Sequence, residues 1–405
     1  MTTAGKVLII VENLPVPFDR RVWQEARTLT EAGYQVTVIC PRGAHASKRH
    51  EVLENIEIFR YPLPLEANGA WGFLLEYGAA FFWLSWLTLR VFLSRGFDVI
   101  HACNPPDFIF LIALPYKWFW RKKFLFDHHD LSPELYLAKG GTRDVFYRLV
   151  CCLERLTFKT ADVSIATNES YREVAVQRGG MPPENVWVLR SGPDLTRFRI
   201  VPPLPDLRAR FAFLVGYVGV MGKQEGLSYL LEAIHHMVFV MGRQDVGFIL
   251  IGSGPDVPRL QAQVRRLDIG AWVIFTGRIA DEDLLRYLCS CDVCVNPDEA
   301  NALNELSTMN KIMEYMALGK PIVQFDLKEG RYTAQEASLY AQKNDPVDLA
   351  RKIVELLHDP TLRASMGAYA RQRVQDHLAW EHQQGHLVAL YRRLCDATVG
   401  AHESE

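Results

Sequence analysis

Short apolar runs alternate with amphipathic segments along the first half of the chain. Strand candidates lie at residues 7–11, 35–40, 99–101, 123–127 and 163–166. The first of them is apolar throughout, as expected for a parallel strand buried on both faces of a sheet. Strands that alternate with helices predict a doubly wound α/β domain.

A helix with one buried face is predicted between the first two strands. Val22, Ala26 and Leu29 recur at helical spacing and predict its buried face. Asp19 precedes this face and is expected to cap the helix, and Gly33 is expected to end it.

The alternation starts again after a proline-rich stretch at 201–205, which suggests a second α/β domain. Its predicted strands are at 215–218, 248–251, 273–275, 293–295 and 321–325. We therefore expect two Rossmann-like domains, at 1–200 and 210–375, with a cleft between them and ligands at the carboxyl ends of the strands. Residues 376–398 carry apolar side chains at helical spacing and are expected to pack back across one of the two domains, with the N-terminal one as our assignment.

Composition narrows the function class. With 45 Lys and Arg against 47 Asp and Glu, the chain has no overall basic field for nucleic acid. Its eight cysteines lack the spacing of a disulfide framework, and the trio Cys289, Cys291 and Cys294 is either a metal cluster or part of a buried strand. We favour the strand and expect no metal. A strand that begins at Lys6 leaves no signal peptide, so a cytoplasmic location is expected.

Aromatic residues are abundant and include nine tryptophans. Residues 77–89 are uncharged but fall short of the roughly 20 residues that span a bilayer. This segment is therefore either deeply buried or in contact with lipid or a partner. Residues 117–123 combine aromatic residues with Lys and Arg, which suits either a membrane interface or a buried helix followed by a charged turn. The tryptophans expected at a membrane are Trp83, Trp86, Trp118 and Trp120.

The stretch 300–326 is the most informative for chemistry. Ser307 or Thr308 is expected to cap a helix that Gly319 ends. The N-terminus of such a helix favours a phosphate. The residues expected on its polar face are Ser307, Asn310, Lys311 and Glu314. Lys311 would add a point charge and Glu314 would accept hydrogen bonds from a ribose diol; the alternative is a solvated amphipathic helix.

The segment Lys311-x-x-Glu314-Tyr-Met-Ala317-x-Gly-Lys-Pro321 resembles the nucleotide-binding motif of GT-B glycosyltransferases, most closely the retaining family four. Phe18–Ala26, Asp127–Leu135, Arg190–Asp194 and Gly252–Pro255 are similar to other blocks of that family and follow in the same order. The resemblance is closest to bacterial enzymes of surface polysaccharide and O-antigen synthesis. It implies an acceptor on the N-terminal domain, a nucleotide sugar on the C-terminal domain, and retention of configuration without a metal.

The resemblance also assigns roles on the donor side. Glu314 matches the second glutamate of the family's E-x7-E motif, and the first would fall on Leu306. Glu305 is our candidate for it, with Asn304 or Ser307 as substitutes. The phosphate-binding Arg and Lys of the family would fall on Val220 and Glu225, so the cations expected there are Lys223 and Arg190. Gly219 and Gly222 would let the backbone approach the ligand, and Arg278 belongs to the segment that contacts the base.

On the acceptor side, His129 matches a family histidine that faces the donor sugar. Its carbonyl or imidazole would stabilise positive charge on the sugar, with Asp130 orienting the ring; His128 is the alternative. Asp19, Arg20 and Arg21 open the first helix and are candidates for acceptor contact, although helix capping alone accounts for Asp19.

These observations predict a retaining, metal-independent transferase that moves a sugar from a UDP-linked donor to a lipid-linked glycan at the cytoplasmic membrane surface. Two alternatives stay open, namely a UDP-sugar 2-epimerase of the same fold and a non-catalytic relative that binds a membrane or a partner. A dehydrogenase is disfavoured, because no G-x-G-x-x-G follows the first strand.

Overall fold

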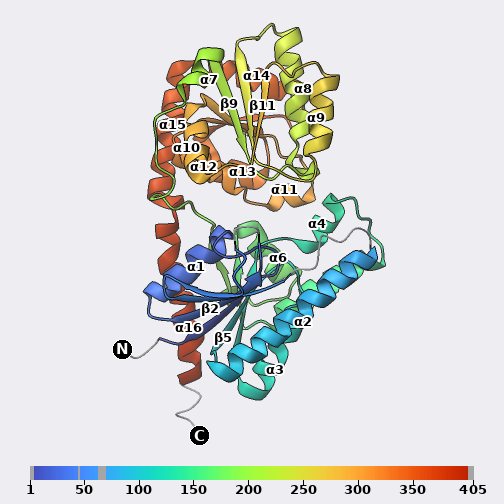
Figure 1. Cartoon of the computed structure of the whole chain (residues 1–405), viewed down its shortest axis with the longest axis vertical. Coiled ribbons are helices and arrows are strands. Elements are labelled where there is room, and N and C mark those ends of the chain that lie inside the picture. Colours follow the sequence, from blue (N-terminus) through green and yellow to red (C-terminus); the bar gives the residue numbers. More distant parts are fainter. Residues whose placement is uncertain (1–3, 44–45, 63–69, 400–405) are drawn as a thin grey trace. The chain divides into compact units, whose positions relative to one another are not determined.

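The computed structural model describes residues 4–43, 46–62 and 70–399, with the side chains of 70–76 and 396–399 excepted. The chain forms two compact units (Figure 1). The first comprises the residues up to Ser191 together with those from Gln383 onward, and the second comprises Gly192–His382. Residues 192–200 and 376–382 thus cluster with the second unit.

The first unit is built on an eight-stranded sheet in the order β3-β4-β2-β1-β5-β6-β7-β8. All neighbouring strands are parallel except β3, which pairs antiparallel with β4. Its strands are β1 (Lys6–Ile10), β2 (Gln35–Pro41), β3 (His50–Leu53), β4 (Ile56–Tyr61), β5 (Val99–Cys103), β6 (Lys123–His128), β7 (Val163–Ala166) and β8 (Val186–Val188). Its helices are α1 (Arg20–Glu31), α2 (Ala70–Ser94), α3 (Phe110–Trp120), α4 (Ser132–Ala138), α5 (Val145–Thr160) and α6 (Glu169–Gln177), followed by the 3-10 turn η1 (Pro183–Asn185).

The second unit has a six-stranded parallel sheet in the order β11-β10-β9-β12-β13-β14. Its strands are β9 (Phe213–Val218), β10 (Val246–Ile251), β11 (Val273–Gly277), β12 (Val293–Asn296), β13 (Ile322–Phe325) and β14 (Ser338–Ala341). Its helices are α7 (Pro205–Arg210), α8 (Leu227–His235), α9 (Val257–Arg266), α10 (Asp281–Ser290), α11 (Ala302–Leu306), α12 (Asn310–Ala317), α13 (Lys328–Ala334), α14 (Pro346–His358) and α15 (Pro360–Arg373). It also contains two 3-10 turns, η2 (Lys223–Glu225) and η4 (Gln335–Ala337), and two π-helical segments, η3 (His236–Val240) and η5 (Val374–Leu378).

Two apolar layers cover the faces of the second sheet, and alternate residues of each strand contribute to them. Val293 and Val295 of β12 point into one layer, and Cys294 points into the other together with Cys289 and Cys291. The buried strand predicted at 291–295 is confirmed as β12, which contains Cys294, whereas Cys289 lies on α10 and Cys291 directly follows it. Every strand predicted from the sequence is present, because continuous apolar runs are characteristic of strands buried on both faces.

Helix α16 (Trp380–Val399) closes the chain and crosses the boundary between the units at His382–Gln383. Leu387, Leu390, Tyr391 and Leu394 are buried within the first unit. The C-terminal segment thus packs back on the N-terminal unit, because these residues form one apolar face at helical spacing.

Candidate active site

The second unit offers a ligand site where its strand order reverses. Strand β9 lies between β10 and β12, and ligands of open α/β sheets bind at the carboxyl ends of strands at such a point. The loop 219–226 follows β9, residues 297–301 follow β12, and α12 begins near the same edge. The sequence predicted donor contacts from the 219–226 loop and from the helix that contains Lys311 and Glu314.

Backbone packs against backbone at this edge. A Cβ on Gly252 would lie 2.0 Å from the carbonyl oxygen of Gly219, and both glycines have positive φ, of 134° and 156°. A side chain at Gly252 is therefore excluded by steric overlap and by backbone conformation. Glycine at these two positions holds the loops after β9 and β10 together.

Lys311 is the centre of an ion triple beneath the 219–226 loop. Its Nζ lies 2.6 Å from Glu225 Oε2, 2.9 Å from Asp298 Oδ1 and 4.9 Å from the centre of the Tyr217 ring. Burial alone would lower the pKa of Lys311, but the charges of Asp298 and Glu225 raise this pKa well above its ordinary range. Burial raises the pKa of Asp298 to about 7 even though Lys311 lowers it. The alternative of a solvated helix face therefore does not hold for Lys311, because its partners come from the β9 loop and from the residues that follow β12.

The helix at 302–317 differs from the one that was predicted. It is divided into α11, capped by Asn301, and α12, whose N-cap position is Met309. Ser307 and Thr308 lie between the two helices, where Ser307 Oγ donates to the carbonyl of Leu303. The prediction of a Ser307 or Thr308 cap was wrong. The spacing of apolar residues cannot show an interruption as short as the three residues between α11 and α12. The predicted end is confirmed, with Gly319 in the left-handed region just after the helix.

The remaining donor-side candidates lie around this edge. Asn304 is buried and its Nδ2 donates to the carbonyls of Gln224 and Glu299. It thereby ties α11 to the β9 loop. Glu305 is turned toward Lys343, whose Nζ lies 3.0 Å from both carboxylate oxygens. The exposed side chains are Lys223, Arg278 and Asn310, and Glu314 is half-buried.

In the first unit, Asn104 holds the backbone that follows β6. Its Oδ1 accepts from the N–H of His129 at 2.6 Å and from that of Asp130 at 3.2 Å. Its Nδ2 donates to the carbonyl of Asp130 at 2.7 Å and to Asp107 at 2.9 Å. Sequence analysis missed Asn104, although a polar residue directly after a buried strand is a recognisable sign of this edge.

The imidazole of His129 contacts Asp127 and Arg21. Its Nε2 lies 2.5 Å from Asp127 Oδ2 and 3.0 Å from Arg21 Nε. The sequence pointed to Asp130 as the orienting carboxylate, but Asp127 has this position, because its side chain projects from the end of β6. His128 points to the opposite face and packs against Phe158 and Tyr171, so it is a core residue.

Three further candidates in this unit have defined places. Asp19 caps α1 as predicted, with its carboxylate accepting from the N–H of Val22. Arg20 is exposed. Arg190 is buried, and its N–H donates to Gln383 Oε1 at the start of the returning segment.

The aromatic residues of α2 and α3 are divided between core and surface. Ala80, Leu84 and Val91 of α2 are buried, while Phe82 and Trp86 are more than half exposed and Trp83 is half-buried. Trp118, Phe119 and Trp120 are 72%, 76% and 50% exposed. Of the two alternatives for 117–123, a buried helix does not hold for these three rings. No helix in the described part of the chain has both the length and the apolar character needed to cross a bilayer.

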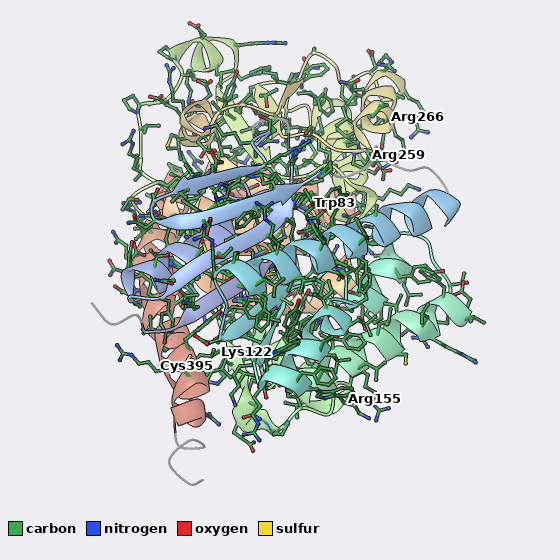
Figure 2. The ribbon with its side chains drawn as sticks, turned by 60° about the horizontal axis from the view of Figure 1, so that its bottom comes forward. Trp83, Lys122, Arg155, Arg259, Arg266 and Cys395 are labelled. Atoms are coloured by element: carbon green, nitrogen blue, oxygen red, sulfur yellow. The ribbon has the colours of Figure 1, made fainter. Side chains whose placement is uncertain are left out.

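Helix α5 adds further exposed apolar and basic side chains beside the exposed rings of α3. This exposed face of α5 was not predicted from the sequence. The helix packs beside α3, which in turn packs beside α2 (Figure 2, in which Trp83, Lys122 and Arg155 are labelled). Val145, Leu149 and Leu156 of α5 are exposed, together with Arg148, Arg155 and Lys159. Among the described side chains of the three helices the single carboxylate is Glu154, which is buried.

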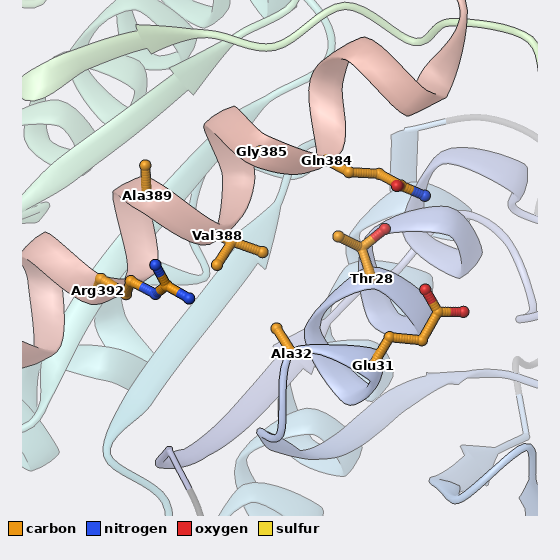
Figure 3. Close-up of a pocket in the computed structure, with 8 residues that line it drawn as sticks. All are labelled: Thr28, Glu31, Ala32, Gln384, Gly385, Val388, Ala389 and Arg392. Carbon is orange, nitrogen blue, oxygen red and sulfur yellow. The ribbon is translucent and has the colours of Figure 1, made fainter.

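A groove of about 430 Å³ lies between α1 and α16 (Figure 3). Ala32, Gly385, Val388 and Ala389 line its apolar part, and Glu31 and Arg392 are among its polar residues. The residues that line this groove show that α16 packs on the C-terminal half of α1. Arg21 lies in the first turn of the same helix.

Two groups in the described part of the chain have the composition of a metal site, and both contain Asp127. One adds His101 and Cys103, and the other adds Glu25 and His129. The Arg21 guanidinium already lies 2.9 Å from Asp127 Oδ1, so a metal ion there would face a fixed positive charge. This donor set does not fit a metal.

Comparison with known proteins assigns both units. Residues 19–197 match the family model described as Glycosyltransferase Family 4, and residues 212–359 match that of Glycosyl transferases group 1. Together these models span about four-fifths of the chain. The chain belongs to the family-4 glycosyltransferases.

This family-4 chain is similar to the GDP-mannose-dependent monoacylated alpha-(1-6)-phosphatidylinositol monomannoside mannosyltransferase of Corynebacterium glutamicum. The two are 26% identical over 207 residues, which cover 48% of this chain and 52% of that protein. The match thus spans about half the length of that relative.

Solved structures share the GT-B fold of this family-4 chain. The sucrose-phosphate synthase of Thermosynechococcus elongatus has a TM-score of 0.80 at 20% identity and covers 97% of this chain and 100% of its own. Anabaena HepE in complex with UDP-glucose has a TM-score of 0.70 at 17% identity, covering 98% and 100%. At these identities the likeness concerns the fold alone.

Proposed function

We propose that the protein transfers a sugar from a nucleoside-diphosphate sugar, UDP-linked in our prediction, to a lipid-linked glycan. The observation that carries the proposal is the convergence of the 219–226 loop, the end of β12 and the start of α12 at the strand-order reversal of the second unit. This edge lies in the region that the glycosyltransferase model matches. A relative whose name includes a phosphatidylinositol mannoside acceptor supports the lipid-linked class.

The donor would be held mainly by main-chain groups. Helix α12 begins without a side-chain cap, so its first N–H groups and its dipole favour a phosphate. The glycines at 219 and 222 allow close approach of the loop, and exposed Lys223 supplies a cation. Glu314, one turn into α12, would accept from the ribose hydroxyls, and Arg278 would lie near the base. Such contacts would stabilise the leaving diphosphate without a metal.

The reaction would replace one C–O bond of the donor sugar by another. The bond between the anomeric carbon and the diphosphate oxygen breaks, and its electron pair leaves with the diphosphate. The acceptor hydroxyl forms the new bond from the same face, and its proton passes to the departing diphosphate oxygen, so configuration is retained. His129 would stabilise positive charge on the sugar through its carbonyl or its imidazole, as the resemblance implies.

The acceptor would arrive from an anionic membrane surface. The rings of Trp118, Phe119 and Trp120 are exposed beside Arg121, and the cations of α5 continue the same surface. Interfacial aromatic rings with neighbouring Lys and Arg suit a headgroup layer that carries negative charge. We propose peripheral association with the inner face of the cytoplasmic membrane through α2, α3 and α5.

A donor panel tests the enzyme proposal. Purified protein is heated with UDP-, GDP- and ADP-sugars, and donor hydrolysis and transfer are followed with a lipid-linked glycan extract. A bound donor should raise the melting temperature, and Glu314→Gln should abolish this shift for the same donor. Glu336→Gln is the matched control, because Glu336 lies on η4 outside this edge. A protein that binds and cleaves none of the donors would refute the proposal.

The same panel separates the alternatives. An epimerase would isomerise UDP-N-acetylglucosamine without any acceptor. A non-catalytic relative is favoured by one observation, the two carboxylates that accompany Lys311 where phosphates would bind. In that case Glu314→Gln and Lys311→Ala would leave biological activity intact.

Vesicle flotation tests the membrane surface. We expect the protein to float with phosphatidylglycerol-containing vesicles and to remain below those of phosphatidylcholine alone. Phe119→Ser should weaken flotation, whereas Phe239→Ser, at an exposed ring of the second unit, should not. Equal flotation of both variants would assign the contact to another surface.

A further inference from the structure

A buried charged cluster in the first unit joins α1 and β6 to residues 189–191. The chain leaves this unit for the second directly after Ser191. The centre of the cluster is Arg21, which is 7% exposed and lies in the first turn of α1. Arg21 Nε and Nη2 donate to the two carboxylate oxygens of Asp127, at 3.2 and 2.9 Å. This is the bidentate fork that a guanidinium forms with a carboxylate and that an ammonium cannot form.

The third nitrogen of Arg21 reaches the segment that leads out of the unit. Nη1 donates to the carbonyl of Leu189 and to Ser191 Oγ, both at 2.9 Å. Ser191 is the last residue of the first unit before the chain crosses to the second at Gly192. One planar group therefore fixes both the end of β6 and the first crossing.

The second crossing is joined to the same cluster. Tyr391 of α16 places its hydroxyl 2.8 Å from His101 Nδ1, and His101 Nε2 lies 3.4 Å from Asp127 Oδ2. Both segments by which the chain passes between units thus connect, within the first unit, to the carboxylate of Asp127. This carboxylate is also the partner of His129.

The cluster contains two acidic partners of Arg21, Asp127 at 2.9 Å and Glu25 at 3.1 Å. Burial and the neighbouring Asp127 raise the pKa of Glu25 well above its ordinary range, although Arg21, at 3.1 Å, lowers it. Burial lowers the pKa of His101. Burial alone would raise the pKa of Asp127, but Arg21 and His129 lower this pKa well below its ordinary range, so the carboxylate stays ionised. These shifts favour the neutral forms of Glu25 and His101 and the ionised form of Asp127, whose Oδ2 faces His129 Nε2.

We propose that Arg21 is a positioning residue: it holds Asp127 so that His129 keeps one tautomer and one place, and it links that place to the Leu189–Ser191 crossing. The proposal rests on the proposed function, in which His129 acts on the donor sugar. Because an ionised Asp127 can only accept, its bond to His129 requires a proton on Nε2, and Arg21 Nε, which lies 3.0 Å from that nitrogen, then donates to Asp127. Because packing transmits displacements of a fraction of an ångström, a shift of the crossing segment would be felt at His129.

The variant Arg21→Lys keeps the charge and removes the fork. Arg27→Lys is the matched control, since Arg27 lies on the same helix, is 40% exposed and pairs with Glu54 outside the cluster. Donor hydrolysis is measured with the sugar nucleotide most active in the panel of UDP-glucose and GDP-mannose. We expect kcat to fall about tenfold or more in Arg21→Lys. The donor KM should change less than about threefold, because the donor contacts lie in the second unit.

A double-mutant cycle separates positioning from general loss of structure. In a His129→Asn background, Arg21→Lys should lower kcat by less than about twofold, because its effect passes through the imidazole. The same factor in both backgrounds, or an unchanged kcat in Arg21→Lys, would overturn the proposal.

The nitrogen-15 shifts of His129 give a readout that needs no turnover. The wild-type protein should show a protonated Nε2, and Arg21→Lys should show a changed tautomer or exchange between tautomers, whereas Arg27→Lys should match the wild type. Identical spectra of Arg21→Lys and wild type would refute the proposal. A wild-type protein that binds no donor would refute the proposed function instead, and the spectra would still decide the role of Arg21.

Discussion

Removal of Lys311 should expose how much the ion triple beneath the 219–226 loop depends on its single cation. In Lys311→Met the side chains of Glu225 and Asp298, which are 17% and 1% exposed, lose an ammonium at 2.6 and 2.9 Å. Breaking a buried pair from one side costs about 3–5 kcal/mol, because the remaining charge stays desolvated. We expect a loss of this size in the second unit at pH 8.

The loss should shrink as pH falls. In the folded protein the pKa of Asp298 is about 7, above its ordinary value of 3.8. The proton therefore favours the folded state, and this contribution is fully present below about pH 4 and lost as pH rises to about 7. At pH 5.5 Asp298 is already neutral, and Lys311→Met then leaves mainly Glu225 without a partner. We expect a cost of about 1–2 kcal/mol at that pH.

Hydrogen exchange of peptides from β9 and β12 measures this quantity in the second unit alone, since each unit can open separately. Lys343→Met is the control, because Lys343 forms an exposed pair with Glu305 and should change stability by less than about 0.5 kcal/mol. A cost below about 1 kcal/mol at pH 8, or equal costs at pH 5.5 and pH 8, would refute the reasoning.

Three further substitutions test packing and hydrogen bonding. Gly252→Ala should destabilise the second unit by several kcal/mol, because its Cβ would meet the Gly219 carbonyl, and its urea midpoint should fall sharply. Gly385→Ala on α16 meets no atom within 4 Å and should raise the melting temperature, with a gain of about 0.5–1 kcal/mol; a loss would indicate a contact at that face. Tyr391→Phe should cost about 1–3 kcal/mol by removing the buried partner of His101, and an unchanged urea midpoint of the first unit would contradict this.

The strands could be predicted because apolar runs buried on both faces are a local property of the sequence. The cap at Asp19 and the helix end at Gly319 were also local, since each depends on residues within one turn. The burial of Lys311 could not be predicted in this way. Glu225 is 86 residues distant in sequence, and strand order alone brings it to Lys311.

The candidate site was predicted at the level of segments and less well at the level of side chains. His129 was identified from its resemblance to a family position, but Asp130 was chosen as its partner because it is adjacent in sequence. The structure gives that place to Asp127 and adds Arg21 from α1, 106 residues away. The exposed face of α5 was missed, since its apolar and basic residues also fit an ordinary amphipathic helix.

The return of α16 to the first unit has a consequence for the order of events during synthesis. The second unit is one continuous stretch, Gly192–His382, and all of it has been translated before Tyr391 exists. The first unit has most of its sheet early but lacks the hydroxyl that pairs with His101 until the last part of the described chain emerges. The unit that is made first on the ribosome is therefore the one that is completed last.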